Sequence, residues 1–138
     1  MSRNASDPAP NSTSMRPDAI LQIHALASEC AKQDWDGNGA RAVARTAVLL
    51  SEAFVLAIPD GVPLPEFAPE PDGSISLDWI QSRSRLFSVS VGAGGRLAFA
   101  WLDGANRGHG TALFDGKRVP PEILEGVKRI VNAERSSR

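Results

Sequence analysis

The side chains best suited to chemistry lie in a short loop at residues 34–40, between two segments with helical patterns. Four residues match positions 1, 3, 5 and 6 of an EF-hand calcium loop, namely Asp34, Asp36, Asn38 and Gly39. The twelfth position should supply a bidentate carboxylate but is Arg45, and Arg41 adds a second cation nearby. Calcium or small-ligand binding by Asp34, Asp36 and Asn38 is therefore an alternative, and our main expectation is that no metal binds here.

The simpler interpretation of this loop is structural. Asp36 and Asn38 are short side chains that bond nearby backbone donors in turns, while Gly37 and Gly39 can adopt positive φ. We expect Trp35 to be buried as an anchor, so that Trp35→Ala costs about 3–5 kcal/mol. The loop would then be a rigid corner between two helices.

A second group of acids offers acid–base chemistry. Its members are Glu66, Glu70, Asp72 and Asp78. A converging pair of carboxylates could serve as the general acid and base of a hydrolase. The prolines around them favour solvated turns instead, so this hydrolase is a remote alternative.

The histidines and the cysteine suggest no catalytic site. His24 falls in the first helical segment, His109 falls between two glycines, and neither has a partner evident from the sequence. Cys30 lies on an apolar helical stripe, which is typical of a buried thiol. We expect no enzyme activity and no cofactor.

Composition limits the class of protein. The chain has 138 residues and a formal net charge of -1, which fits one domain with no global attraction for nucleic acid. It has no apolar run of membrane-spanning length, no secretory signal pattern and only one cysteine. These features predict a cytoplasmic protein without membrane contact, with a disordered tail at 1–15, one domain at 16–133 and a frayed end at 134–138.

The elements that must position these residues follow from hydrophobic periodicity. Pro17 suits the start of a first helix, and apolar residues spaced by three and four predict a second helix over 43–58. The second helix is apolar nearly all round, which leaves Val48 and Val55 on a spare face. A spare apolar face indicates burial on two sides or contact with another chain.

The remaining elements predict a sheet and a last helix. The proline-rich stretch 59–71 is extended and includes a short edge strand at 66–68. Alternating patterns predict strands over 75–79, 87–91, 97–101 and 111–114, with a hairpin at 92–95 and a longer turn at 104–110. Pro120 and Pro121 open a C-terminal helix. The fold class is α+β, with two N-terminal helices, an antiparallel sheet of four to five strands and a C-terminal helix packed on one sheet face.

Two motifs carry a resemblance to a known family. The first is Trp-Asp-Gly-x-Gly-Ala, with Trp35, Asp36, Gly37, Gly39 and Ala40, and the second is Pro-Asp-Gly at 71–73 followed by a strand ending in Leu77, Asp78 and Trp79. Over about residues 18–115 this order resembles a family of small uncharacterised bacterial proteins. The resemblance implies a shared structural unit and brings no activity with it.

Protein interaction is therefore the function that we expect. The spare helix face and the small side chains on one face of the sheet are the candidate contact residues, namely Val48, Val55, Ser88, Ser90, Ala98 and Ala100. The stretch from Glu52 to Asp78 has no lysine or arginine and could steer a basic partner. The partner would be another protein or a second copy of the chain.

Overall fold

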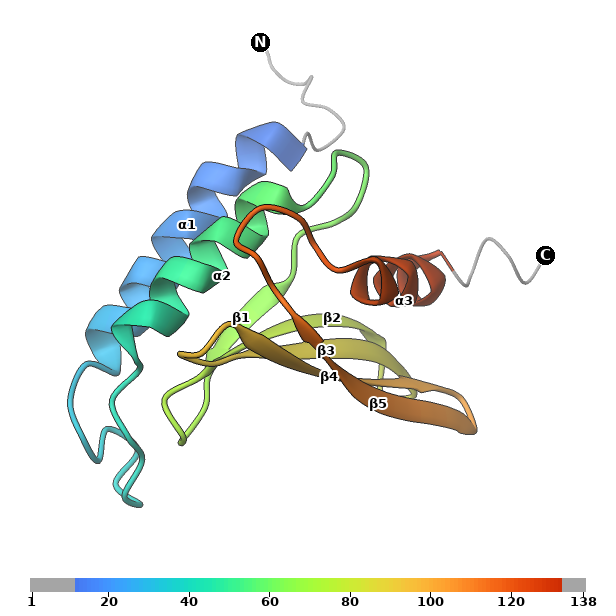
Figure 1. Cartoon of the computed structure of the whole chain (residues 1–138). Helices are drawn as coiled ribbons and strands as arrows, with labels where there is room; N and C mark the ends of the chain where they lie inside the picture. Colours follow the sequence, from blue (N-terminus) through green and yellow to red (C-terminus); the bar gives the residue numbers. More distant parts are fainter. Residues whose placement is uncertain (1–11, 133–138) are drawn as a thin grey trace, which may run out of the picture.

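The computed structural model describes residues 12–132 and has an α+β architecture (Figure 1). Its elements are α1 (Ser12–Glu29), α2 (Arg45–Ala57), β1 (Glu66–Pro69), β2 (Ile75–Ser82), β3 (Arg85–Val91), β4 (Arg96–Asp103), β5 (Asn106–Leu113) and α3 (Pro121–Val131). The predicted second helix, edge strand, three alternating strands and C-terminal helix are confirmed. Residues 1–11 and 133–138, which include most of the predicted tail and all of the predicted frayed end, lie outside the described residues.

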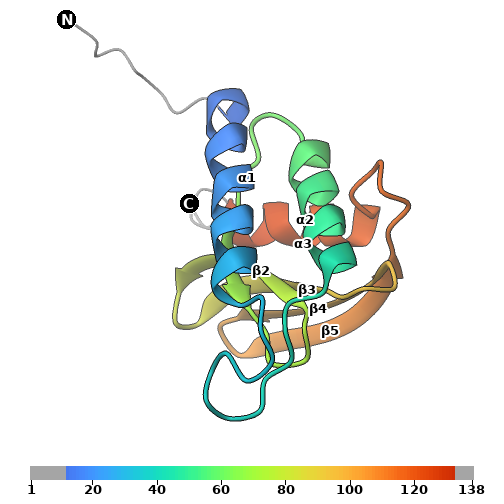
Figure 2. The same ribbon diagram turned by 90° about the vertical axis from the view of Figure 1, so that its left-hand side faces the viewer.

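The five strands form an antiparallel meander in the order β1-β2-β3-β4-β5. Figures 1 and 2 show all three helices on the same side of this sheet, with α1 beside α2 and with α3 apart from them and running in a different direction. Large apolar side chains of the central strands alternate toward the helices, while the uncovered face carries Ser88, Ser90, Ala98 and Ala100 together with a row of larger apolar residues, Ile80, Leu86 and Leu102. This is the predicted arrangement, with the sheet at its full five strands.

Aromatic side chains from three elements form the centre of the core. The Phe54 ring of α2 lies 6.4 Å from that of Trp79, which in turn lies 6.4 Å from the ring of Phe87. Gly126 of α3 lets that helix approach the sheet closely, because a Cβ there would meet the Phe87 ring at 2.3 Å. The core therefore depends on residues from both ends of the chain.

The apolar stripe predicted for α2 faces the core, as expected. Ala47, Phe54 and Ile58 are buried, and the other two members of the stripe, Val43 and Leu50, pack against the core. The buried face is wider than this stripe, because Ser51 and Val55 are also fully buried. The assignment of Val55 to a spare face is therefore wrong, and Val48 is only partly buried and packs against the core.

The first helix begins earlier than the sequence indicates. α1 starts at Ser12, so Pro17 lies inside the helix and residues 12–15 are not part of a tail. A proline removes one backbone hydrogen bond but has a φ that suits a helix, so helical turns can precede it. In residues 12–132 no helix has both the length and the apolar character that a membrane crossing requires.

The last strand also begins earlier than predicted. The segment 104–110 was expected to be a turn, but β5 starts at Asn106 and includes Gly108 and Gly110. A Cβ at Gly108 would lie 2.6 Å from the Trp101 ring, and one at Gly110 would lie 2.8 Å from the Phe99 ring. These glycines make room for aromatic rings of β4 rather than for a turn.

Candidate functional site

An open apolar surface lies on the outside of α1 and α2. Leu21 of α1 is 65% exposed, and on α2 Leu49 is 53% and Leu56 is 65% exposed. Leu21 and Leu56 line a hollow of about 670 Å3 together with Arg16, Pro17, Ile20 and His24. We call the surface formed by Leu21, Leu49 and Leu56 the helix-pair surface.

A second hollow continues this surface along the helix pair. It has a volume of about 580 Å3 and is lined by residues that include His24, Ala27, Val43, Val48, Leu49 and Glu52. His24 lines both hollows, so they adjoin each other. The helix-pair surface is thus one continuous region rather than separate exposed leucines.

The helices are held so that these leucines point away from the core. Ala19 and Ile23, four residues apart on α1, are buried against the rest of the fold. On α2, Leu49 and Leu56 are seven residues apart and lie opposite the buried face. Sequence reasoning recognised an apolar side of α2 away from the core stripe but assigned the contact to Val48 and Val55 instead of these leucines.

Polar contacts cross the helix-pair surface and neutralise its charges. His24 Nε2 of α1 contacts Glu52 Oε2 of α2 at the point where the hollows meet. Arg16 pairs with Asp60 at 3.1 Å and donates a hydrogen bond to the carbonyl oxygen of Ile58. The surface therefore combines exposed apolar side chains with a His24–Glu52 contact between the hollows and an Arg16–Asp60 ion pair.

The predicted calcium ligands bond to their own loop. Asp34 Oδ1 accepts a hydrogen bond from Gly39 N at 2.6 Å, and Asp36 Oδ1 accepts from Asn38 N at 2.8 Å and Ala40 N at 3.0 Å. Gly37 and Gly39 have positive φ, as predicted for a structural corner. Residues 12–132 hold no group of three or more His, Cys, Asp or Glu side chains arranged to bind a metal ion.

Trp35 holds this loop differently from the prediction. It is only partly buried and lies outside the core, so the expected burial as an anchor is wrong. Its indole N–H instead donates a hydrogen bond to the carbonyl oxygen of Arg41 at 2.7 Å. The loop has enough internal hydrogen bonds to keep its shape without placing the ring in the core.

The two motifs behind the predicted family resemblance meet in space. Arg41 N donates to the carbonyl oxygen of Pro71 at 2.7 Å, and Ala44 N donates to that of Gly73 at 2.9 Å. Gly73 has a φ of 95°, and a Cβ there would lie 3.0 Å from the Ala42 carbonyl oxygen. The 34–40 loop and the Pro-Asp-Gly turn therefore form one structural unit that supports the start of β2.

The uncovered sheet face carries the other predicted contact residues. Ser88, Ser90, Ala98 and Ala100 all lie on this face, and the two alanines are exposed. Asp78 Oδ1 accepts hydrogen bonds from Ser76 Oγ at 2.6 Å and Ser88 Oγ at 2.5 Å. The part of the face around these residues is small and polar, whereas Ile80, Leu86 and Leu102 make another part of the same face apolar.

The predicted acids do not form one cluster. Glu66 lies directly opposite Asp78 across β1 and β2, and Glu70 accepts a hydrogen bond from the Ser90 hydroxyl. Asp72 caps its own turn by accepting from Ser74 N at 2.9 Å. Three of the four carboxylates thus accept hydrogen bonds from residues of the sheet or of their own turn.

The cysteine and the two histidines lie apart from one another. Cys30 is buried, and burial raises the pKa of its thiol, with the charge of Glu29 adding to the effect. His24 is on the helix side of the molecule, whereas His109 is on the uncovered sheet face. The described structure therefore does not place either histidine beside the thiol.

Comparisons with protein-family models, curated proteins and solved structures found no match to this chain. The resemblance of the Trp35–Ala40 and Pro71–Trp79 motifs to a family of small bacterial proteins therefore stays a prediction.

Proposed function

We propose that this chain is a non-catalytic protein-interaction module that binds a partner protein through the helix-pair surface. The observation that carries this proposal is the exposure of Leu21, Leu49 and Leu56 around two adjoining hollows. A contiguous apolar surface bordered by polar residues is typical of a protein contact site.

The energetics favour an apolar partner segment. Full burial of a leucine side chain contributes about 1.5–3 kcal/mol relative to leaving it in water. Leu21 and Leu56 lie on different helices around one hollow, so a single inserted apolar side chain can contact both. An amphipathic helix of the partner fits this geometry, because its apolar residues recur along one side at helical spacing.

The polar contacts beside the leucines would affect the orientation of a bound partner more than its affinity. His24 contacts Glu52, and Arg16 is paired with Asp60. Partly exposed polar contacts of this kind contribute little free energy, although they restrict which polar groups a partner can place nearby. The leucines are therefore the residues to change in a test.

The test compares partner capture by the wild-type chain with capture by Leu21→Glu and Leu56→Glu. The matched control is Ile80→Glu, because Ile80 is 52% exposed but belongs to β2, away from the helix pair. Tagged full-length chains are expressed in the native host, and captured proteins are quantified by mass spectrometry after thermal melts show that each variant folds.

We expect a captured protein whose yield falls at least about tenfold with either leucine variant and is unchanged with Ile80→Glu. Equal capture by all four chains would contradict the proposed surface. A protein lost only with Ile80→Glu would move the contact to the sheet.

A further inference from the structure

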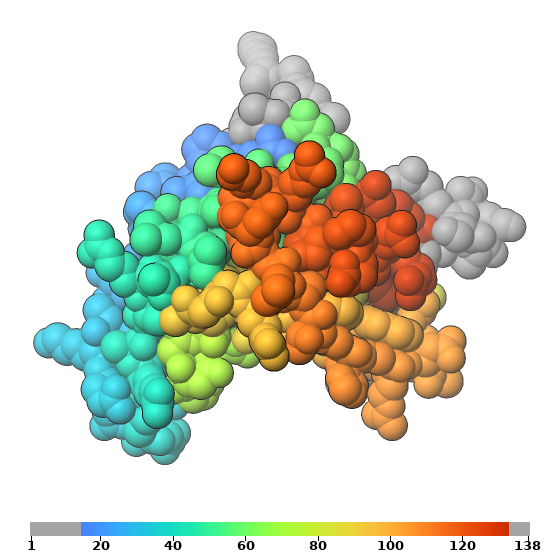
Figure 3. All heavy atoms as spheres, in the orientation of Figure 1, coloured from blue at the N-terminus to red at the C-terminus, as the bar shows by residue number. Residues whose placement is uncertain are grey.

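The second open feature of the molecule is the outer edge of β5. β5 pairs with β4 on one side, and no other described segment pairs with it on the other side. Figure 3 shows this strand, in orange, at the front surface below the red α3. An eight-residue edge of this kind presents unpaired backbone donors and acceptors.

The hydrogen-bond pattern of the β4–β5 hairpin identifies these unpaired groups. Phe114 N donates to Gly95 O at 3.0 Å, which marks that pair as hydrogen-bonded. Hydrogen-bonded and non-bonded pairs alternate along an antiparallel ladder. Every second residue counted back from Phe114 is therefore hydrogen-bonded to β4. The backbone N–H and C=O groups that point away from the sheet belong to the residues between them: Arg107, His109, Thr111 and Leu113.

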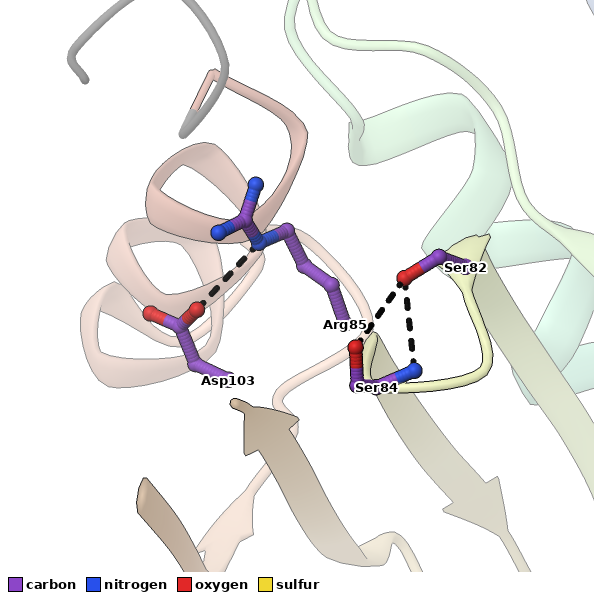
Figure 4. Close-up of polar contacts among 4 residues, drawn as sticks. All are labelled: Ser82, Ser84, Arg85 and Asp103. Atoms are coloured by element: carbon purple, nitrogen blue, oxygen red, sulfur yellow. Dashed lines mark hydrogen bonds and ion pairs between the residues drawn. The ribbon is translucent and has the colours of Figure 1, made fainter. Parts of the chain in front are cut away.

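The edge is held firmly in strand conformation. The Trp101 ring lies between Gly108 and the guanidinium of Arg129, whose Cζ is 5.6 Å from the ring centroid. At the start of the strand, Arg85 Nε bonds Asp103 Oδ1 at 3.2 Å (Figure 4). Gly104 N also donates to Ser84 O at 2.7 Å, which ties this hairpin to the β2–β3 turn. A partner strand would therefore meet a preformed edge.

We propose that β5 pairs antiparallel with β5 of a second copy of this chain, around a twofold axis at Gly110. In this register Arg107 lies opposite Leu113 of the partner subunit, and His109 lies opposite Thr111 of the partner subunit. Every outward-pointing residue then belongs to a hydrogen-bonded pair, and each pair exchanges two backbone hydrogen bonds. The two sheets join into one continuous sheet.

The side chains of β5 suit a second copy as partner. The strand has no proline, and its only permanent charge, Arg107, lies opposite a leucine, so no like charges face each other. Leu113 is 76% exposed, the most exposed large apolar side chain in the described residues. On the uncovered face Ile80, Leu86, Leu102 and Arg107 form one row across the sheet, and Leu113 of the partner subunit extends that row.

This pairing goes beyond the proposed function, because it uses a different surface and a different occupant. The helix-pair surface can be wrong while the dimer is right, and the reverse also holds. Variants at Leu21 and Leu56 should leave self-association unchanged.

Sedimentation velocity of the full chain over a concentration series tests the pairing. We expect the wild type to dimerise and Thr111→Pro to weaken dimerisation at least about tenfold, because it removes an outward N–H donor from each subunit. Thr111→Val is the matched control, since it keeps the donor and should dimerise as the wild type does. A wild-type chain that stays monomeric at every concentration overturns the proposal, as does Thr111→Pro dimerising like the wild type.

A charge exchange tests the register without relying on proline. Leu113→Lys places a lysine opposite Arg107 of the partner subunit and should weaken the dimer at least about tenfold. The double variant Arg107→Glu, Leu113→Lys places opposite charges in those positions and should restore it. Equal weakening by both variants would contradict this register, and folding of each variant is checked by its thermal melt.

Discussion

β1 and β5 are the two edge strands of one sheet, but they differ in the backbone N–H donors that point away from the sheet. In β1, Glu70 N donates to Ser74 O at 2.9 Å just beyond the strand, and alternation from this pair places the N–H groups of residues 67 and 69 outward. Residue 69 is a proline and has no N–H group. All the outward positions of β5 carry an N–H donor.

The surroundings of the two edges add to this difference. β1 lies between further prolines at 65 and 71, contacts α1, and is followed by a turn to which the 41–44 segment is hydrogen-bonded. β5 is twice as long, and no described strand pairs with its outer side. Prolines, short length and covering segments are the usual means of preventing edge pairing. The comparison indicates that this fold closes one edge and leaves the other available.

The largest loss of stability is expected on substitution of Trp79, which is hydrogen-bonded to the proline-rich segment that precedes β1. Trp79 is buried, and its indole N–H donates to the Pro63 carbonyl oxygen at 2.8 Å. Trp79→Ala should lower the free energy of unfolding by about 3–5 kcal/mol, measured by urea denaturation. Trp79→Phe keeps most of the packing and should lose less than half as much. A loss for Trp79→Ala that is no greater than for Trp79→Phe would mean that the ring is not part of the core.

A smaller loss is expected at Gly108, inside the open edge. Gly108→Val should cost about 1–3 kcal/mol, because the new side chain displaces the Trp101 ring. The control is His109→Val on the exposed face of the same strand, which should change stability little. Denaturation curves that are identical for the two variants would show that the ring does not lie over the glycine.

Trp35 should matter less than Trp79, although both indoles bond a backbone carbonyl near the β1 side of the molecule. Because Trp35 is only partly buried, Trp35→Ala should cost about 1–2 kcal/mol, chiefly from the lost hydrogen bond to Arg41 O. The two tryptophan variants are best compared in the same denaturation series. If Trp35→Ala lowers the free energy of unfolding as much as Trp79→Ala does, Trp35 is a buried anchor after all and its partial exposure is contradicted.

The smallest change in stability is expected on substitution of Asp115, which follows β5 in the chain. Its carboxylate accepts hydrogen bonds from the backbone N–H groups of Arg118 and Lys117, and these bonds lower its pKa below the ordinary value of 3.8. A lowered folded-state pKa stabilises the fold above the unfolded value, and this contribution is lost as pH falls through the folded value. Asp115→Ala should therefore melt at a lower temperature than the wild type at pH 7, with the gap shrinking below pH 3.8. A gap independent of pH would exclude this role for the carboxylate.

Regular patterns made most of the fold predictable from the sequence. β2, β3 and β4 alternate clearly, proline marks β1 as an edge, and α3 begins at a proline pair. The first half of β5 was predicted as a turn because glycines normally signal a turn, whereas here they accommodate rings from the neighbouring strand. That requirement comes from tertiary contacts, which local sequence does not contain.

The candidate site was predicted less well for a related reason. The spare apolar side of α2 was expected, but the buried face extends past the predicted stripe over Ser51 and Val55, so Val55 is buried and Leu56 is exposed. Leu21 became part of the site only when α1 packed beside α2. A surface shared by two helices depends on how they pack, and periodicity within one helix cannot supply this information.

Residue-resolved amide hydrogen exchange at low and high protein concentration tests most directly whether the β5 edge is open for pairing. The outward amides of Arg107, His109 and Leu113 should exchange fast in dilute samples and become protected at high concentration. The outward amide of Phe67 on β1 should not respond to concentration, and Thr111→Pro should remove the protection on β5. Fast exchange of the β5 amides at every concentration would contradict the account.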